Sequence, residues 1–157
     1  MKRARLLALP SPLWCLVPIT LGLSTRPVGA QMVWQADVRI QALDLTALKG
    51  YVTVRVVVYS DNGDNARNAA LHLFLPVGTK AARLPPGCQS SPSPTAAQAR
   101  VDCALGELRV RDLREVSIVA TAPPAGVPGR FAVFVYSDTP DPQMTNNYAE
   151  RAVTVNP

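Results

Sequence analysis

The chain has little histidine: His72 is the only one among its 157 residues. A catalytic triad or a metal-hydrolase centre normally needs a histidine placed against a nucleophile or beside further ligands. The sequence has no Gly-x-Ser-x-Gly motif and no second histidine to pair with His72. We therefore expect no enzyme and no cofactor, and a carboxylate-pair hydrolase stays open as a remote alternative.

An excess of basic charge is also missing once the first thirty residues are set apart. That segment carries Lys2, Arg3, Arg5 and Arg26 but no acidic residue, so the remainder has twelve basic and eleven acidic residues. No basic patch with interleaved aromatic residues remains. Nucleic acid binding therefore has no electrostatic support.

Residues 1–30 have the three-part pattern of a secretory signal peptide. A positively charged start precedes an apolar run over residues 6–23, and Val28, Gly29 and Ala30 offer small residues at positions −3 and −1 before a cleavage site. The rival interpretation is a retained membrane anchor, but prolines interrupt the run and a span normally needs about twenty apolar residues. We expect an exported protein of the cell surface, periplasm or medium. Residues 31–157 would form one domain without a membrane span.

Two cysteines remain after this segment, Cys88 and Cys103, fifteen positions apart. An even pair in an exported chain is most simply a disulfide. A nucleophilic thiol would need a nearby base, and His72 is the only imidazole in the chain. The sequence therefore predicts a Cys88–Cys103 disulfide.

Seven short β-rich stretches follow, and none of them has the pattern of a long amphipathic helix. Val52, Val54, Val56 and Val58 share one face of the stretch 51–59, and Leu71, Leu73 and Leu75 share one face of the stretch 68–76. The first stretch alternates Val38, Ile40 and Ala42 against polar residues. Residues 84–98 are rich in proline and serine, and we expect no strand there. The pattern predicts an all-β, immunoglobulin-like antiparallel β-sandwich of about seven strands, at 36–45, 51–59, 68–76, 99–105, 114–122, 129–137 and 148–155.

An ordered set of motifs resembles one known family. The motifs are "ADVRI" (36–40), "VTVRVVVYSDNGDNARN" (52–68), "ALHLFLPVGT" (70–79), "CALGEL" (103–108) and "SDTPDPQMTNNYAERAVTV" (137–155). Together they resemble the conserved repeat domain of prokaryotic surface proteins, a domain of unknown function with the number eleven. The resemblance implies an immunoglobulin-like fold on an exported protein, without catalytic residues. This chain differs from the usual pattern in carrying a single copy.

Two loops rich in aspartate and asparagine are the main candidates for a site. Their carboxylates are candidate ligands for calcium, which takes six to eight oxygens, and they are Asp61, Asp64, Asp138 and Asp141. The simpler interpretation is turn chemistry, because such side chains bind nearby amides and proline fixes φ. The turn-forming set is Asn62, Gly63, Asp138, Pro140, Asp141, Pro142, Asn146 and Asn147.

The leading functional hypothesis is an exported, non-catalytic module with a structural, adhesion or protein-interaction role. A protein partner or a second copy would bind through a sheet edge, a sheet face or loops. The alternative is an exported domain that binds calcium or a small ligand. Aromatic residues lie in or beside the predicted strands, and Phe74 faces outward if Leu73 and Leu75 face the core. A stripe of aromatic side chains is therefore a candidate binding surface, with cross-strand packing as the plainer interpretation.

Overall fold

The structure is a computed structural model that describes residues 33–92 and 98–156. The predicted signal segment lies outside these residues. The strands are β1 (Ala36–Leu48), β2 (Tyr51–Gly63), β3 (Ala66–Phe74), β4 (Ala81–Arg83), β5 (Cys88–Pro92), β6 (Ala99–Leu108), β7 (Leu113–Thr121), β8 (Gly129–Tyr136) and β9 (Tyr148–Val153), with a short 3₁₀ helix, η1 (Met144–Asn146), before β9. No helix in the described residues is long and apolar enough to cross a membrane.

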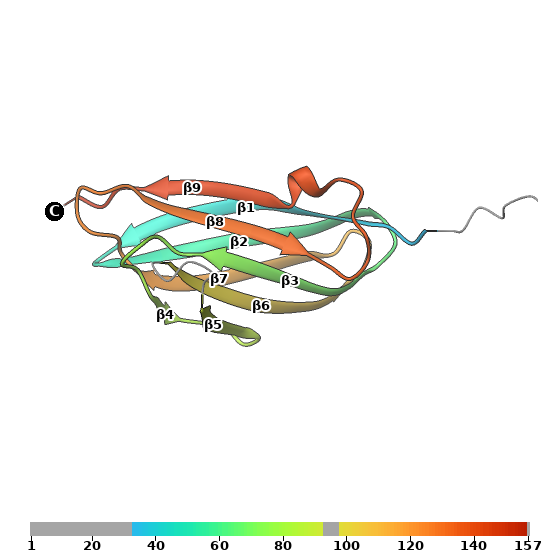
Figure 1. Cartoon of the computed structure of the whole chain (residues 1–157), viewed down its shortest axis with the longest axis horizontal. Helices are drawn as coiled ribbons and strands as arrows, with labels where there is room; N and C mark the ends of the chain where they lie inside the picture. The colour runs from blue at the N-terminus through green and yellow to red at the C-terminus, as the bar shows by residue number, and fades with distance from the viewer. Residues whose placement is uncertain (1–32, 93–97, 157) are drawn as a thin grey trace, which may run out of the picture. The chain divides into compact units, whose positions relative to one another are not determined.

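The strands form two antiparallel sheets packed as a sandwich (Figure 1). The four-stranded sheet has the order β1-β2-β7-β4, and the five-stranded sheet has the order β5-β6-β3-β8-β9. Strands β1, β2, β7 and β4 correspond to A, B, E and D of an immunoglobulin constant-type domain, and β3, β8 and β9 correspond to C, F and G. The predicted immunoglobulin-like sandwich is confirmed.

The core lies between the sheets and follows the predicted alternation. The valines Val52, Val54, Val56 and Val58 of β2 are completely buried, as are Leu71, Leu73 and Leu75 on the opposing sheet. Burying such a side chain stabilises the fold by about 1.5–3 kcal/mol. His72 and Phe74 are only partly buried and lie on the outer face of β3.

A β-bulge in β1 changes which side chains enter the core. The register with β2 shifts between Ile40 and Ala42. The prediction that Ala42 continues the face of Val38 is therefore wrong, and Leu43, which is 4% exposed, takes the core position. One extra residue in a strand reverses the faces that follow it.

The sheets contain two short strands that were not predicted, β4 and β5, so the described residues form nine strands rather than about seven. The expectation that 84–98 contains no strand is wrong for β5. Strand β5 is the outermost strand of its sheet and pairs only with β6. Its single proline, Pro92, is its last residue, and an edge strand tolerates proline because one side of its backbone needs no ladder bond.

The predicted disulfide is confirmed. Cys88 and Cys103 face each other directly across β5 and β6, with an S–S distance of 2.00 Å. The bond therefore fastens the edge strand β5 to its neighbour β6.

Candidate functional site

The first Asp/Asn loop joins β2 to β3 and starts later than predicted. Asn62 and Gly63 are the last residues of β2 rather than the centre of the turn. Gly63 has φ +88°, a conformation that side chains with Cβ rarely adopt. The Asp61 carboxylate forms an ion pair with Arg39 at 3.1 Å. Oδ2 of Asp64 accepts a hydrogen bond from the backbone amide of Gln35, at 3.0 Å.

The second loop joins β8 to β9 and contacts the first one. Oδ2 of Asp138 accepts a hydrogen bond from Nδ2 of Asn68, at 2.7 Å. The buried Thr139 hydroxyl accepts from the amide of Arg67 and donates to the carbonyl of Asn65. These contacts hold the two loops together at one end of the sandwich.

The Asp141 carboxylate accepts three hydrogen bonds in and around this second loop. Its Oδ2 accepts hydrogen bonds from the amide of Val38 (2.9 Å) and from Nδ2 of Asn147 (3.1 Å). Its Oδ1 accepts from the amide of Gln143 (2.7 Å). Nearby, Asn146 donates to the buried Asp37 carboxylate at 2.9 Å. The loop therefore fastens the start of β1 to the opposite sheet.

The four calcium candidates do not gather into one site. Asp64 and Asp138 line the same polar concavity, whose lining also includes Val110 and Pro140. Asp61 and Asp141 are not part of this lining. Within the described ranges, no group of three His, Cys, Asp or Glu side chains is arranged to hold a metal ion. The contacts that these carboxylates do make are with backbone amides, side-chain amides and one arginine.

The outer face of the five-stranded sheet carries a different cluster, which we call the aromatic face: His72, Phe74, Phe134, Tyr136 and Tyr148. They come from three neighbouring strands, β3, β8 and β9. The register places His72 opposite Phe134, and Phe134 opposite Tyr148, so that a continuous row of rings crosses the sheet. Tyr136 and Tyr148 are 36% and 50% exposed.

The rings of the aromatic face lie close to one another and are partly aligned. The ring centroids of Phe134 and Tyr136 are 6.2 Å apart with an interplanar angle of 16°. His72 packs beside Tyr136 with centroids 4.8 Å apart and an angle of 31°. Aromatic pairs at such separations stabilise each other by roughly 0.5–1.5 kcal/mol beyond their burial. The result is a broad, weakly polar platform of π faces.

A paired carboxylate borders this platform on β6. Nδ1 of His72 donates to Oδ1 of Asp102 at 2.6 Å, and Nη2 of Arg100 donates to Oδ2 at 2.9 Å. Partial burial acts to raise the pKa of Asp102, but hydrogen bonds from Ser91, Arg100 and His72 outweigh it and lower the pKa below its ordinary value. The carboxylate is therefore ionised at neutral pH, and its charge is neutralised within the cluster.

A second paired carboxylate borders the opposite side, on β9. The Tyr148 hydroxyl donates to Oε2 of Glu150 at 2.7 Å, and Arg130 forms a short ion pair with Oε1. The hydrogen bond raises the pKa of Tyr148. The same bond, with that from Arg130, lowers the pKa of Glu150.

The His72–Asp102 pair lies at a shallow concavity of the surface. The other described residues that line it are Ala70, Gly87, Cys88, Gln89, Arg100, Cys103, Ala104 and Tyr136. Both cysteines are in the disulfide, and the Ser91 side chain hydrogen-bonds the Asp102 carboxylate. The lining therefore supplies ring faces and hydrogen-bonding groups.

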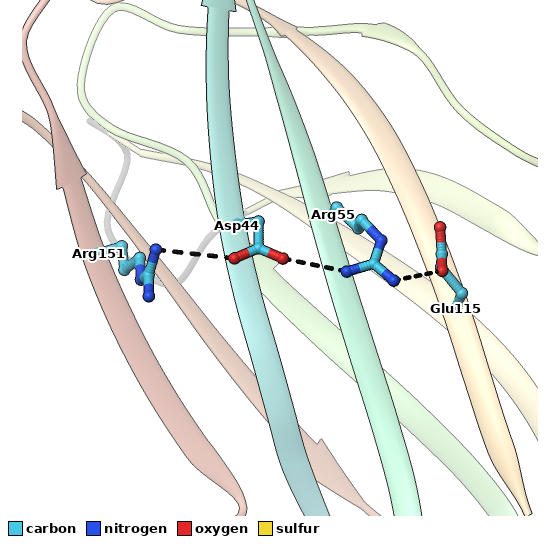
Figure 2. Close-up of polar contacts among 4 residues, drawn as sticks. All are labelled: Asp44, Arg55, Glu115 and Arg151. Carbon is cyan, nitrogen blue, oxygen red and sulfur yellow. Dashed lines mark hydrogen bonds and ion pairs between the residues drawn. The ribbon is translucent and has the colours of Figure 1, made fainter.

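The four-stranded sheet has an outer face of another kind. A row of alternating charges, Asp44–Arg55–Glu115, crosses β1, β2 and β7, and Arg151 extends it from β9, an edge strand of the other sheet (Figure 2). The N–O distances are 3.0 Å for Arg55–Asp44, 2.7 Å for Arg55–Glu115 and 3.7 Å for Arg151–Asp44. Hydrogen bonds to Glu115 and Asp44 raise the pKa of Arg55, and the bond from Arg55 lowers that of Glu115. Such exposed pairs are typical of a solvated surface and contribute little to stability.

Sequence reasoning placed His72 and Phe74 on an outer face but missed Arg100 and Asp102. The alternation of buried leucines with other residues along β3 was enough to place His72 and Phe74. Asp102 lies thirty positions from His72, and only the pairing of β3 with β6 brings the two together. No spacing rule along the chain could reveal that contact.

The similarity of this chain to known proteins is weak in both sequence and structure. No family model matches the chain, and no curated protein matches its sequence. Among solved structures, the chain is similar to the chitin-binding domain of Chi18aC from Streptomyces coelicolor, with 10% identity, a TM-score of 0.42, and 62% of this chain and 90% of that chain covered. It is also similar to a cohesin module from a Clostridium perfringens family 33 glycoside hydrolase, with 12% identity, a TM-score of 0.45, and 78% and 97% covered. Similarity at this level gives no argument about ligands or activity.

Proposed function

We propose that this chain is an exported, non-catalytic module that binds an extracellular or envelope ligand through its aromatic face. The observation that carries the proposal is the contrast between the two outer faces. One presents a row of alternating charges, while the other presents contiguous rings. Exposed aromatic side chains gathered on one face are characteristic of binding surfaces, whereas scattered ones need no explanation.

The chemistry of the aromatic face favours an uncharged, extended ligand such as a glycan chain. Asp102 and Glu150 are each paired with an arginine, so the platform has little net charge to attract an ion. Ring faces stack against the apolar C–H faces of sugars, and the bordering polar groups can hydrogen-bond hydroxyl groups. A sheet-edge route for the partner has less support, because two of the outermost strands, β4 and β5, are short. The other two, β1 and β9, lie beside each other.

Export and family membership are part of this proposal. The Cys88–Cys103 disulfide supports an oxidising compartment, and the sequence pattern of residues 1–30 supports secretion. The motif resemblance to the repeat domain of surface proteins agrees with both but stays a prediction. A calcium-binding role is the weaker candidate, because each of its four proposed carboxylates already has a partner.

The test compares two ring truncations with a matched control. Tyr136→Ser and Tyr148→Ser remove exposed rings from the aromatic face, and Tyr59→Ser removes a ring that lies under Arg39 on the other sheet. Each purified protein is incubated with isolated cell envelopes and with insoluble polysaccharides, and the bound fraction is measured. We expect binding to fall for the first two variants and to persist for the control. Equal binding by all three folded variants would refute the role of the aromatic face.

A further inference from the structure

One end of the sandwich combines exposed apolar side chains with basic ones. It consists of three connections, β1–β2, β3–β4 and β7–β8, and we call it the apolar–basic end. The connections are neighbours in space: the amide of Ala122 donates to the carbonyl of Gly50, and the amide of Thr121 donates to the carbonyl of Lys80, both at 2.8 Å. Gly129, which follows the third connection, lies against Pro76 of the second.

Each connection exposes an apolar residue at its turn. Leu48 and Tyr51 flank the β1–β2 turn and are 68% and 49% exposed. Val77 and Val127 are 60% and 53% exposed in the other two connections. Four large apolar side chains therefore project into solvent at one end of a small domain, an arrangement that water disfavours unless something covers it.

The turns hold these side chains outward by their own hydrogen bonds. Lys49 and Gly50 both have positive φ, the conformation of a tight hairpin turn. The buried Thr79 donates to the carbonyl of Pro76 at 2.7 Å and so fixes the turn that contains Val77. The amide of Val127 donates to the carbonyl of Pro124 at 3.1 Å. The exposure is thus part of the folded structure of each turn.

The charge at this end has one sign. Lys49 and Lys80 are exposed beside the apolar residues, and Arg83 lines a shallow apolar depression with Leu48 and Tyr51. The sequence has no Asp or Glu over residues 45–60, 65–101 or 116–137, which contain all three connections. The opposite end of the sandwich carries the aspartates of the Asp/Asn loops.

We propose that the apolar–basic end binds an anionic phospholipid surface, with its turns inserted into the headgroup region. Lysines attract anionic lipids, and apolar and tyrosine side chains partition into the interface. The apolar residues come from three separate turns interspersed with lysine. A deformable lipid surface accommodates such tips without a matching shape, whereas a protein partner would need a complementary one. This proposal is independent of the ligand of the aromatic face.

The experiment measures cosedimentation of the full chain with vesicles of phosphatidylglycerol mixed with phosphatidylcholine, and with vesicles of phosphatidylcholine alone. Two test variants are Leu48→Ser with Val127→Ser, and Lys49→Gln with Lys80→Gln. The controls change exposed residues of the opposite end: Leu113→Ser, where Leu113 is 54% exposed, and Arg109→Gln. All variants share the same N-terminal segment, so it cannot account for a difference among them.

We expect binding to the anionic vesicles that weakens with added salt. The double lysine substitution should weaken it roughly thirtyfold, at about 1 kcal/mol for each lysine near the surface. The Leu48/Val127 substitution should also weaken it, and both controls should bind as the unmodified chain does. The proposal is overturned if the unmodified chain does not bind anionic vesicles, or if test and control variants bind equally. It is also overturned if a photoreactive residue at position 48 cross-links to a protein and the chain does not bind the vesicles.

Discussion

The carboxylate of Asp141 accepts a hydrogen bond from the backbone amide of Val38, 2.9 Å away, although 103 positions separate the two residues. The same carboxylate also binds the amide of Gln143 and the side chain of Asn147. Close by, the amide of Ala36 donates to the carbonyl of Pro140 at 3.0 Å. The β8–β9 connection thus acts as a clasp that holds the first strand of one sheet against the other sheet.

Asp141→Ala should destabilise the domain by about 2 kcal/mol, because three hydrogen-bond donors lose their carboxylate acceptor and some are left partly buried. Thermal unfolding measures the effect. Asp61→Ala is the control, because Asp61 has only an exposed ion pair with Arg39, and such pairs contribute little. Equal stability of the two variants would contradict the clasp. A melting temperature of the unmodified chain that rises with calcium would instead revive the metal interpretation.

Gly63→Ala should destabilise the fold more than Gly78→Ala. Both glycines have positive φ, +88° and +80°, so the backbone strain of about 1 kcal/mol is common to both. A Cβ at position 63 would lie 2.3 Å from the carbonyl oxygen of Gln35, whereas nothing lies within 4 Å of one at position 78. Chemical denaturation of the pair isolates the steric contribution. Equal losses of stability in the two variants would mean that Gln35 moves away from the new Cβ without a cost in free energy.

Seven of the nine strands in the described residues were readable from the sequence, because alternating apolar and polar residues mark the face that packs toward the core. Three features were not readable. The bulge between Ile40 and Ala42 reverses the alternation midway. Strand β5 carries proline and serine because it is an edge strand, where few positions are buried. The contact of His72 with Asp102 depends on which strands become neighbours, and that is decided by packing of the whole domain.

Cys88→Ser combined with Cys103→Ser should lower the free energy of unfolding by about 3 kcal/mol, the loop-closure value for a bridge across fifteen positions. The loss should be greatest for the β5–β6 hairpin, which the bond fastens. Hydrogen exchange resolves this: amides of β5 should lose protection before those of β2. The exported, unfolded protein should also resist alkylation until it is reduced, and free thiols at both positions would contradict the pairing.

Acid should destabilise the domain, in part through Asp102. Its pKa is lower in the folded chain than the ordinary value of 3.8. Its ionised form therefore stabilises the fold at pH values above the unfolded pKa, and this contribution disappears as the pH falls through the folded pKa. Asp102→Asn cannot titrate, so its stability should be lower at neutral pH and should converge on that of the unmodified chain in acid. The pKa values of Glu115 and Glu150 are also lowered, so these exposed carboxylates contribute in the same direction, weakly because solvent screens them. Parallel stability curves for the two proteins would contradict the assignment.

The central claim is that the aromatic face is the surface through which the module meets its ligand. The most direct measurement uses two variants, each with one photoreactive amino acid. One variant carries it in place of Tyr136, on the aromatic face, and the other in place of Ser117, an exposed residue on the outer face of the four-stranded sheet. Cells that export each variant are irradiated, and the cross-linked products are identified. The account predicts a discrete cross-linked product from position 136, whether glycan, protein or a second copy, and none from position 117. Products from position 117 alone, or the same products from both positions, would contradict it.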